Sequence, residues 1–236
     1  MSQSSSEENN AQQQTHLLKS IDSTILIRQI PSEGIAFQLW PAAATLVSLL
    51  DRHRLHEPTP LSSLFTSTTH RRLRLLELGS GTGLVGISAA ALLGASVTVT
   101  DLPNVLPNLK YNVAANAAVV ELHGGAVEVT ELSWGDERQM EAIAGGGDYD
   151  VMLGSDVVYH EHLYEQLIQT LRYFLLGPSE KKIVFLMAHI KRWKKECAFF
   201  KKAKKLFDVE VIYTESPSEG SRVGVCIYTF VRKKGL

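Results

Sequence analysis

The fold of this chain is decided by the stretch Leu75-Leu76-Glu77-Leu78-Gly79-Ser80-Gly81-Thr82-Gly83-Leu84. Apolar residues lead up to three glycines at alternate positions, and a segment of small and apolar residues follows through Leu93. This pattern predicts a buried strand, a tight turn and then a helix. Glycine allows a ligand to approach the backbone closely, and the first turn of a helix has unpaired N–H groups. We therefore expect a nucleotide-like cofactor to lie over this turn.

The composition is that of an ordinary globular protein. Hydrophobic residues make up 44% and charged residues 21% of the 236 residues, which predicts one domain with one substantial core. The net charge of −1 gives no general attraction to nucleic acid or to an anionic membrane. No apolar run approaches the ~20 residues of a membrane span, and the N-terminus lacks the apolar core of a signal peptide. Cys197 and Cys226 fit neither a disulfide framework nor a zinc site, which predicts core thiols in the cytoplasm or the nucleus.

The order of the predicted elements indicates an α/β fold. Residues 1–16 are almost entirely polar and predict a disordered tail, followed by a single domain over 17–236. Alternating apolar residues at 23–30 predict a strand or hairpin arm, and a helix is expected from Ala42 to about Asp51. Further along, strands alternate with helices, which predicts a Rossmann-like, seven-stranded, mostly parallel sheet with helices on both faces and an antiparallel last strand. The predicted strands are 73–78, 96–101, 126–132, 149–154, 182–188, 207–213 and 223–231, and the helices are 84–93, 103–118, 137–144, 161–176 and 193–205.

The glycine turn departs from two common nucleotide-binding motifs. The dinucleotide fingerprint requires a third glycine where this chain has Leu84, and the P-loop requires a Gly-Lys-Ser/Thr that is absent. Asp101 ends the next predicted strand, where its carboxylate could accept both hydroxyls of a ribose. A carboxylate there suits more than one cofactor, so Asp101 alone leaves the choice open.

A resemblance to a known family narrows the choice. The turn Glu77–Gly83 with Asp101 resembles the seven-strand S-adenosylmethionine-dependent methyltransferases. Three further matches are Leu39-Trp40-Pro41-Ala42-Ala43, Leu132-Ser133-Trp134-Gly135 and Asp156-Val157-Val158-Tyr159. Together they resemble the protein-lysine methyltransferases of methyltransferase family 16, and most closely the methyltransferase-like 21 branch, over roughly residues 25–230.

The resemblance implies a metal-free enzyme that uses S-adenosyl-L-methionine and releases S-adenosyl-L-homocysteine. It implies that Asp101 binds the ribose, that Trp134 flanks the adenine and that Trp40 reaches the cofactor from the N-terminal segment. Glu77 would accept from the cofactor's ammonium, or would instead be a structural acceptor that orders the turn. The cofactor-binding residues implied are Trp40, Glu77, Gly79, Ser80, Gly81, Asp101, Leu102, Trp134 and Ser155.

Asp156 and Tyr159 are the predicted catalytic residues. A lysine has a reference pKa of about 10.4, so it is almost fully protonated at neutral pH and cannot attack a methyl group. An aromatic, partly desolvated pocket disfavours the ammonium. We expect Asp156 to orient the lysine and Tyr159 to form a wall of its channel; the alternative is a helix cap and a core tyrosine. Related amide methyltransferases have two prolines where this chain has Val157 and Val158, which favours an amine substrate.

The expected partner is a protein substrate, without direct contact to nucleic acid or membrane, and the chain is expected to be a monomer. The basic run at 191–205 is either a solvated face or a docking surface for an acidic protein or a ribonucleoprotein. His160 and His162 lack a third ligand at metal-binding spacing and are expected at the surface, whereas His189 is a candidate for the substrate rim. Two other functions stay open: methylation of another residue or a small molecule, and a cofactor-binding scaffold without activity.

Overall fold

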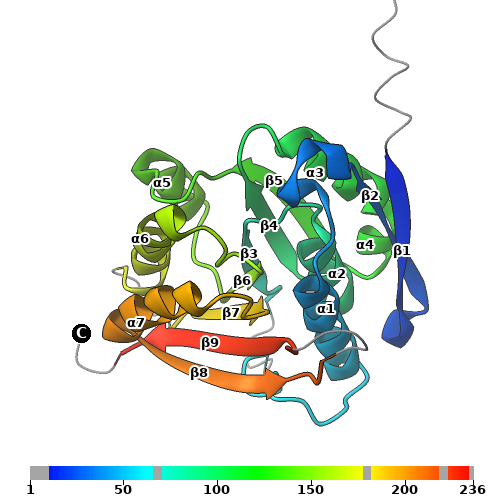
Figure 1. Ribbon diagram of the computed structural model, residues 1–236. Helices are drawn as coiled ribbons and strands as arrows, with labels where there is room; N and C mark the ends of the chain where they lie inside the picture. The colour runs from blue at the N-terminus through cyan, green and yellow to red at the C-terminus, as the bar shows by residue number, and fades with distance from the viewer. Residues whose placement is uncertain (1–10, 66–70, 178–181, 218–222, 234–236) are drawn as a thin grey trace, which may run out of the picture.

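A seven-stranded sheet forms the centre of the computed structural model, which describes residues 11–65, 71–177, 182–217 and 223–233 (Figure 1). The strand order is β5-β4-β3-β6-β7-β9-β8. The first five strands in that order are parallel, and the last strand of the chain, β9, runs antiparallel between β7 and β8. The predicted topology is therefore confirmed. The strands are β3 (Arg74–Leu78), β4 (Ser96–Asp101), β5 (Ala126–Glu131), β6 (Val151–Ser155), β7 (Val184–His189), β8 (Phe207–Thr214) and β9 (Cys226–Arg232).

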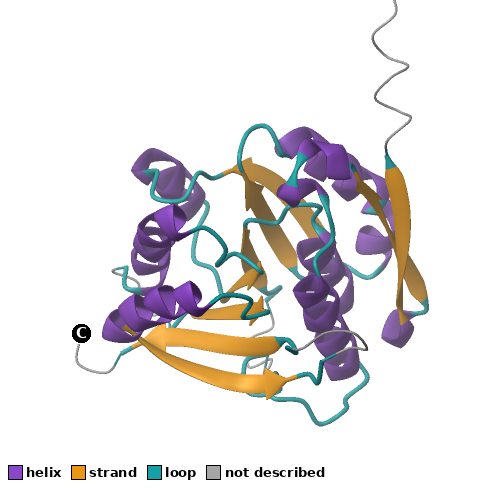
Figure 2. Ribbon diagram, viewed as in Figure 1, coloured by secondary structure: helices purple, strands orange, loops and turns teal. Residues whose placement is uncertain are grey.

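Helices cover both faces of this sheet (Figure 2). Successive strand residues point to opposite faces, so Leu75 joins a core under α1 and α2, and Leu76 joins a second core under α5, α6 and α7. None of the helices in the described part of the chain is long and apolar enough to cross a membrane. Cys197 is exposed and Cys226 is half-buried, so the prediction of two core thiols was wrong. The helices are α1 (Pro41–Arg54), α2 (Leu84–Leu93), α3 (Leu106–Ala115), α4 (Ala117–Leu122), α5 (Glu137–Gly145), α6 (Tyr164–Leu175) and α7 (Cys197–Leu206).

An N-terminal hairpin lies beside the sheet, outside the helices (Figure 1). β1 (Gln12–Leu18) pairs antiparallel with β2 (Ser23–Gln29), so residues 12–16 are not part of a disordered tail as the sequence predicted. Strand pairing uses backbone N–H and C=O groups, which polar residues supply as well as apolar ones do. Residues 1–10 of the predicted tail lie outside the described residues.

Three asparagines four residues apart hold the hairpin against α3. Asn116 accepts from the N–H of Leu26 and donates to its carbonyl, both at 2.8 Å. Asn112 makes the same pair of bonds with Arg28, at 2.8 and 3.0 Å, and Asn108 accepts from the Arg28 guanidinium. The side-chain amides thus make the hydrogen bonds to the β2 backbone that a neighbouring strand would make. Asn116 also separates α3 from α4, where the sequence predicted one continuous helix.

Candidate active site

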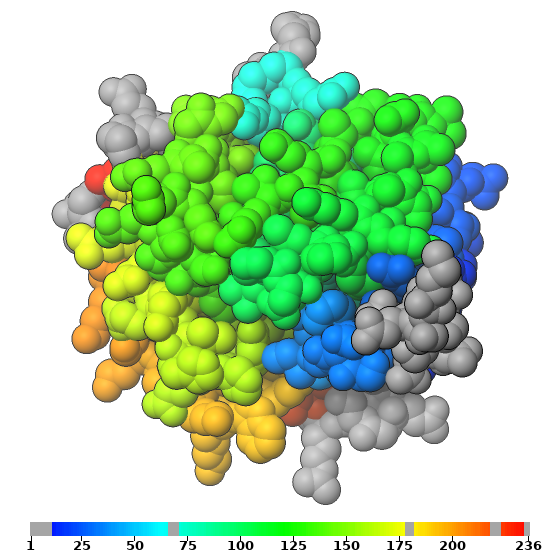
Figure 3. Space-filling model, turned by 90° about the horizontal axis from the view of Figure 1, so that it is seen from above, coloured from blue at the N-terminus to red at the C-terminus, as the bar shows by residue number. Residues whose placement is uncertain are grey.

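One cavity gathers the predicted site residues at the carboxyl ends of β3, β4 and β6. Its volume is about 570 Å³, within the range of small-molecule sites. The N-terminal segment before α1 closes one side, and Figure 3 shows this blue segment lying against the green middle of the chain. Of the eleven predicted residues, ten line the cavity: Trp40, Gly79, Ser80, Gly81, Asp101, Leu102, Trp134, Ser155, Asp156 and Tyr159.

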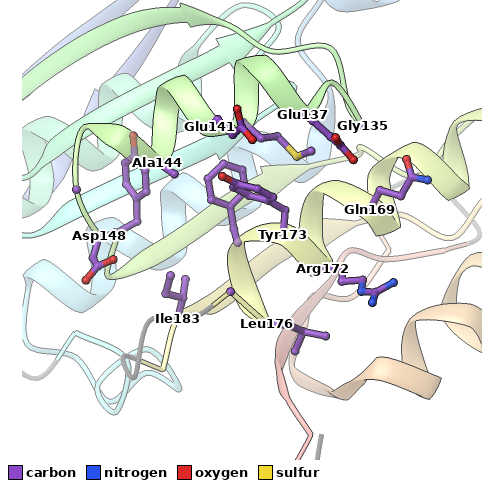
Figure 4. A pocket seen from close by; sticks show the side chains of 15 residues that line it. Gly135, Glu137, Glu141, Ala144, Asp148, Gln169, Arg172, Tyr173, Leu176 and Ile183 are labelled. Atoms are coloured by element: carbon purple, nitrogen blue, oxygen red, sulfur yellow. The ribbon is translucent and has the colours of Figure 1, made fainter.

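A second, larger cavity of about 1020 Å³ lies between α5 and α6 (Figure 4). Its lining includes Glu137, Tyr149 and Tyr173, but none of the predicted site residues. Asp148 and Ile183 also line it, and they precede β6 and β7, at the amino ends of these strands. Open α/β sheets bind their ligands at the carboxyl ends of the strands. The cavity at that edge is therefore the candidate active site, although it is smaller.

The glycine turn has a backbone that only glycine adopts easily. Gly79, Gly81 and Gly83 have φ angles of 59°, 56° and 86°. A Cβ at Gly81 would stand 2.9 Å from the Ala36 carbonyl oxygen, and one at Gly79 would stand 3.0 Å from the Trp134 ring. The glycines therefore let two walls of the cavity, the η4 segment (Ile35–Phe37) and Trp134, approach the turn closely.

Glu77 is the predicted site residue that does not line the cavity. Its side chain is buried beneath the turn, where Oε2 accepts from the N–H of Gly86 at 3.0 Å and Oε1 has no partner among the described residues. Burial raises the pKa of Glu77 to about 8. This geometry matches the alternative prediction, a structural acceptor that orders the turn. Gly86 was not predicted as a site residue, and a Cβ at this position would stand 2.6 Å from the same carboxylate oxygen.

Asp101 presents a carboxylate to the cavity at the end of β4. Oδ2 accepts from the N–H of Gly81 at 2.7 Å, and Oδ1 accepts from the N–H of Leu102 at 2.8 Å. Burial raises the pKa of Asp101, and these two N–H groups oppose the rise. Each oxygen accepts one of these bonds and keeps capacity for another, so the carboxylate suits a pair of ligand hydroxyls. It caps no helix, because α3 begins after Val105 without a side-chain cap.

Three aromatic side chains form much of the remaining wall. The rings of Trp134 and Tyr159 pack edge to face with their centroids 6.4 Å apart. Trp40 donates its indole N–H to the Ile35 carbonyl at 2.9 Å, which holds the ring over the N-terminal segment. Burial, and then the negative charge of Asp101, raise the pKa of Tyr159, so its hydroxyl stays protonated at neutral pH.

Asp156 is held by the segment that follows β7. Its φ is +53°, its Oδ1 accepts from the N–H of Ile190 at 3.0 Å, and its Oδ2 accepts from the Arg192 guanidinium at 2.9 Å. Burial by itself would raise the pKa of Asp156, but hydrogen bonds from His189, Arg192 and Ile190 keep it below its usual value. Asp156 is therefore ionised at neutral pH. Arg192 was predicted only as a member of the basic run at 191–205. Its position just after β7, a strand that ends at this edge of the sheet, was the available indication of a role in the site.

The histidines near the cavity differ in their burial. His189, a candidate for the substrate rim, is instead fully buried, with Nε2 at 3.2 Å from Glu196 and Nδ1 at 3.4 Å from Asp156. His160 lines the cavity, and its ring stacks on His162 at 5.3 Å. Across the described ranges, no three His, Cys, Asp or Glu side chains come together in a way that could hold a metal ion.

Known proteins share the fold and the family of this chain. The solved structure of the human methyltransferase 10 domain containing protein has the same fold, with a TM-score of 0.55 over 86% of this chain and 87% of that chain at 14% identity. The fold is thus that of a methyltransferase. A family model described as lysine methyltransferase matches residues 19–206, and the chain belongs to this family, methyltransferase family 16.

Curated relatives place the chain near the methyltransferase-like 21 enzymes, as the sequence motifs predicted. Protein N-lysine methyltransferase METTL21A of Danio rerio is 33% identical over 85% of this chain and 79% of its own length. Protein-lysine methyltransferase METTL21E of Mus musculus is 32% identical over 79% of this chain and 76% of its own length. The chain is an enzyme of the lysine methyltransferase class.

Proposed function

We propose that the cavity binds S-adenosyl-L-methionine and that this chain transfers a methyl group to a lysine side chain of a protein substrate. The observation that carries the proposal is the convergence of ten predicted residues, from segments far apart in the sequence, on one cavity in a chain of this family. When bound, the cofactor supplies a methyl group activated by a sulfonium. The chemistry of the lining fits it: a carboxylate for the ribose, aromatic rings for the adenine, and backbone groups of the glycine turn for the amino-acid end.

Asp101 would bind the ribose, because its oxygens keep acceptor capacity beyond the two backbone bonds. Trp134 and Leu102 would flank the adenine, and the backbone of Ser155 would line the adenosine side. Gly79, Ser80 and Gly81 would meet the methionine portion, with Trp40 closing the cavity from the N-terminal segment. From beneath the turn, Glu77 would accept a hydrogen bond from the Gly86 N–H and so keep the turn ordered.

Asp156 and Tyr159 would position the side chain of the substrate lysine. Deprotonating a lysine with a pKa near 10.4 at pH 7 costs about 4–5 kcal/mol, and a partly desolvated aromatic wall lowers that cost. The Tyr159 ring, packed on Trp134, would exclude water from the amine. The Asp156 carboxylate would orient the amine, and orientation is the largest contribution that the protein makes to such a transfer.

The test is to incubate the purified protein and tritiated cofactor with a lysate of cells that lack the protein. We expect label on a protein band, and mass spectrometry then identifies the methylated lysine. Label only in small metabolites would favour the small-molecule alternative, and no label would favour the scaffold. Y159A and D156A should abolish labelling, and Y173A, in the other cavity, should not.

We further propose that the protein substrate presents acidic groups near its target lysine. Lys195 and the 59%-exposed Trp193 line the mouth of the cavity, with Lys194 adjacent in η6 (Lys194–Glu196). In contrast, Lys202 on α7 pairs with Glu165 at 2.7 Å. K194E/K195E should raise KM for the labelled acceptor and reduce its salt dependence, whereas K201E/K204E on α7 should change neither. Equal changes in KM and in salt dependence for the two double variants would contradict the proposal of an acidic substrate.

The proposed setting is the cytoplasm or the nucleus, and the proposed state is a monomer. Two free thiols, one of them exposed, suit a reducing compartment. Microscopy of the tagged protein and light scattering of the purified chain test the two statements.

A further inference from the structure

Arg192 lies inside the candidate active site although it belongs to a run of exposed basic residues. Its guanidinium contacts Asp156 Oδ2 at 2.9 Å and lies 5.2 Å from the centre of the Trp40 ring. The Arg192 side chain is 31% exposed and that of Asp156 is 4% exposed. The Arg192 side chain is therefore accessible from the cavity, whereas the Asp156 carboxylate is shielded from bulk water.

A buried network fixes this arrangement from below. Glu196, which is 1% exposed, accepts from the backbone N–H of Arg192 at 3.0 Å and contacts His189 Nε2 at 3.2 Å. His189 in turn places Nδ1 3.4 Å from Asp156. Arg192 is thus held at its backbone by Glu196 and at its guanidinium by Asp156. This double anchorage keeps the cation next to the carboxylate before any substrate arrives.

The charge of Asp156 poses a problem for methyl transfer to lysine. A carboxylate within about 4–6 Å of an amine favours its protonated form and raises its pKa by about one to three units. The ammonium has no lone pair with which to attack. A bare Asp156 would therefore orient the substrate lysine but keep it in the unreactive state.

We propose that Arg192 is a positioning residue that balances the charge of Asp156, so that the substrate lysine reacts as the free amine. The inference rests on the proposed function. In the transfer, the amine nitrogen forms a bond to the methyl carbon as the carbon–sulfur bond breaks, and the sulfur keeps that electron pair. The proton that the lysine gave up beforehand passes to water. Arg192 itself gives and takes no proton.

Other ionisable groups face the same space and must be separated from this effect. Tyr159 stays neutral at neutral pH because burial and the charge of Asp101 raise its pKa, and Asp101 itself accepts from two backbone N–H groups. His189 and Glu196 lie beneath Asp156, without exposure to the cavity. Glu77 lies beneath the glycine turn with a pKa raised to about 8, and His160 and Lys195 line the cavity, so these three groups could also contribute a pH dependence. Repeating the measurement in E77Q, H160Q and K195Q backgrounds removes each of them.

The experiment measures kcat as a function of pH, because kcat reports ionisations in the enzyme–substrate complex. The probe is the acceptor protein labelled in the lysate experiment, with tritiated cofactor, from about pH 6.5 to about pH 10.5 around the reference pKa of lysine. R192Q should move the midpoint of the profile up by about one unit, so that kcat falls about tenfold near neutral pH and recovers in alkali. R192K should keep the wild-type midpoint. D156N/R192Q, which removes both charges, should return the midpoint toward the wild-type value at a lower rate.

Two results would overturn the inference. If kcat of R192Q fell by the same factor at every pH, Arg192 would have a structural role. If kcat of R192Q rose near neutral pH, the Arg192 side chain would instead obstruct the binding of the substrate lysine. Cofactor binding by R192Q, measured by calorimetry, checks that the variant folds, and R192K and the double variant provide independent readings. Failure of the wild-type protein to label any lysine would instead overturn the proposed function, so the two failures are distinguishable.

Discussion

Glu77 should make the stability of this protein fall as pH rises through the neutral range. Burial beneath the glycine turn raises its pKa from 4.5 to about 8. A carboxyl group with a raised native pKa binds its proton more tightly in the folded state than in the unfolded state. Its contribution to stability is therefore fully present below pH 4.5 and is lost as pH rises to about 8. At about 1.36 kcal/mol for each pH unit, the whole interval corresponds to roughly 5 kcal/mol.

The assay is urea denaturation of the wild type and of E77Q at several pH values from about 5.5 to about 8, within the interval over which the two states differ in protonation. The glutamine oxygen keeps the acceptor for the Gly86 N–H and cannot ionise. Other carboxyl groups titrate equally in both proteins, so the informative quantity is the difference in unfolding free energy between them. That difference should shift in favour of E77Q by about 3 kcal/mol over this range.

A pH-independent difference in unfolding free energy between the two proteins would contradict this prediction, because it would mean that Glu77 does not titrate in this range. A shift in favour of the wild type with rising pH would be a stronger contradiction, since it would require a lowered pKa. Saturation with cofactor gives a second readout. If the cofactor's ammonium lies near the turn, it should flatten the pH dependence of the wild type by favouring ionised Glu77.

Three further perturbations test other parts of the structure. N112A should cost about 2–4 kcal/mol in urea denaturation, because it removes the amide partner of the Arg28 N–H and of the Thr82 carbonyl and leaves the Arg28 carbonyl only the longer bond from Asn108, at 3.3 Å, whereas K110A on the same helix should be near neutral. G81A should weaken cofactor binding in calorimetry at least tenfold, because a Cβ would meet the Ala36 carbonyl at 2.9 Å and the φ of 56° disfavours alanine; unchanged affinity would count against a tight turn. The difference in thermal stability between the wild type and D156N should close as pH falls below 3.8. The pKa of Asp156 is lowered in the folded state, so its carboxylate stabilises the fold only while it is ionised.

The order and direction of the strands could be predicted because the chain alternates local patterns that each specify one element. A buried strand such as β6 is a nearly continuous apolar run, and a helix such as α6 has apolar residues on one face. The hairpin partner β1 could not be predicted, since its residues 12–16 are polar and its strand exists only through pairing with β2. The asparagine contacts on α3 were equally hidden, because their spacing indicates a helix face but not what that face meets.

The glycine turn, the carboxylate that ends the next strand and the motifs that identify the family can all be read directly from the amino-acid sequence. These features are local, or lie at the ends of strands that a parallel sheet necessarily brings to one edge. The position of Glu77 beneath the turn and outside the cavity follows from the three-dimensional packing, because its burial depends on how α2 packs over β3. The same packing pairs Arg192, one of many basic residues, with Asp156. Charge partners of this kind are set by which chain segments cross in space, and no sequence pattern carries that information.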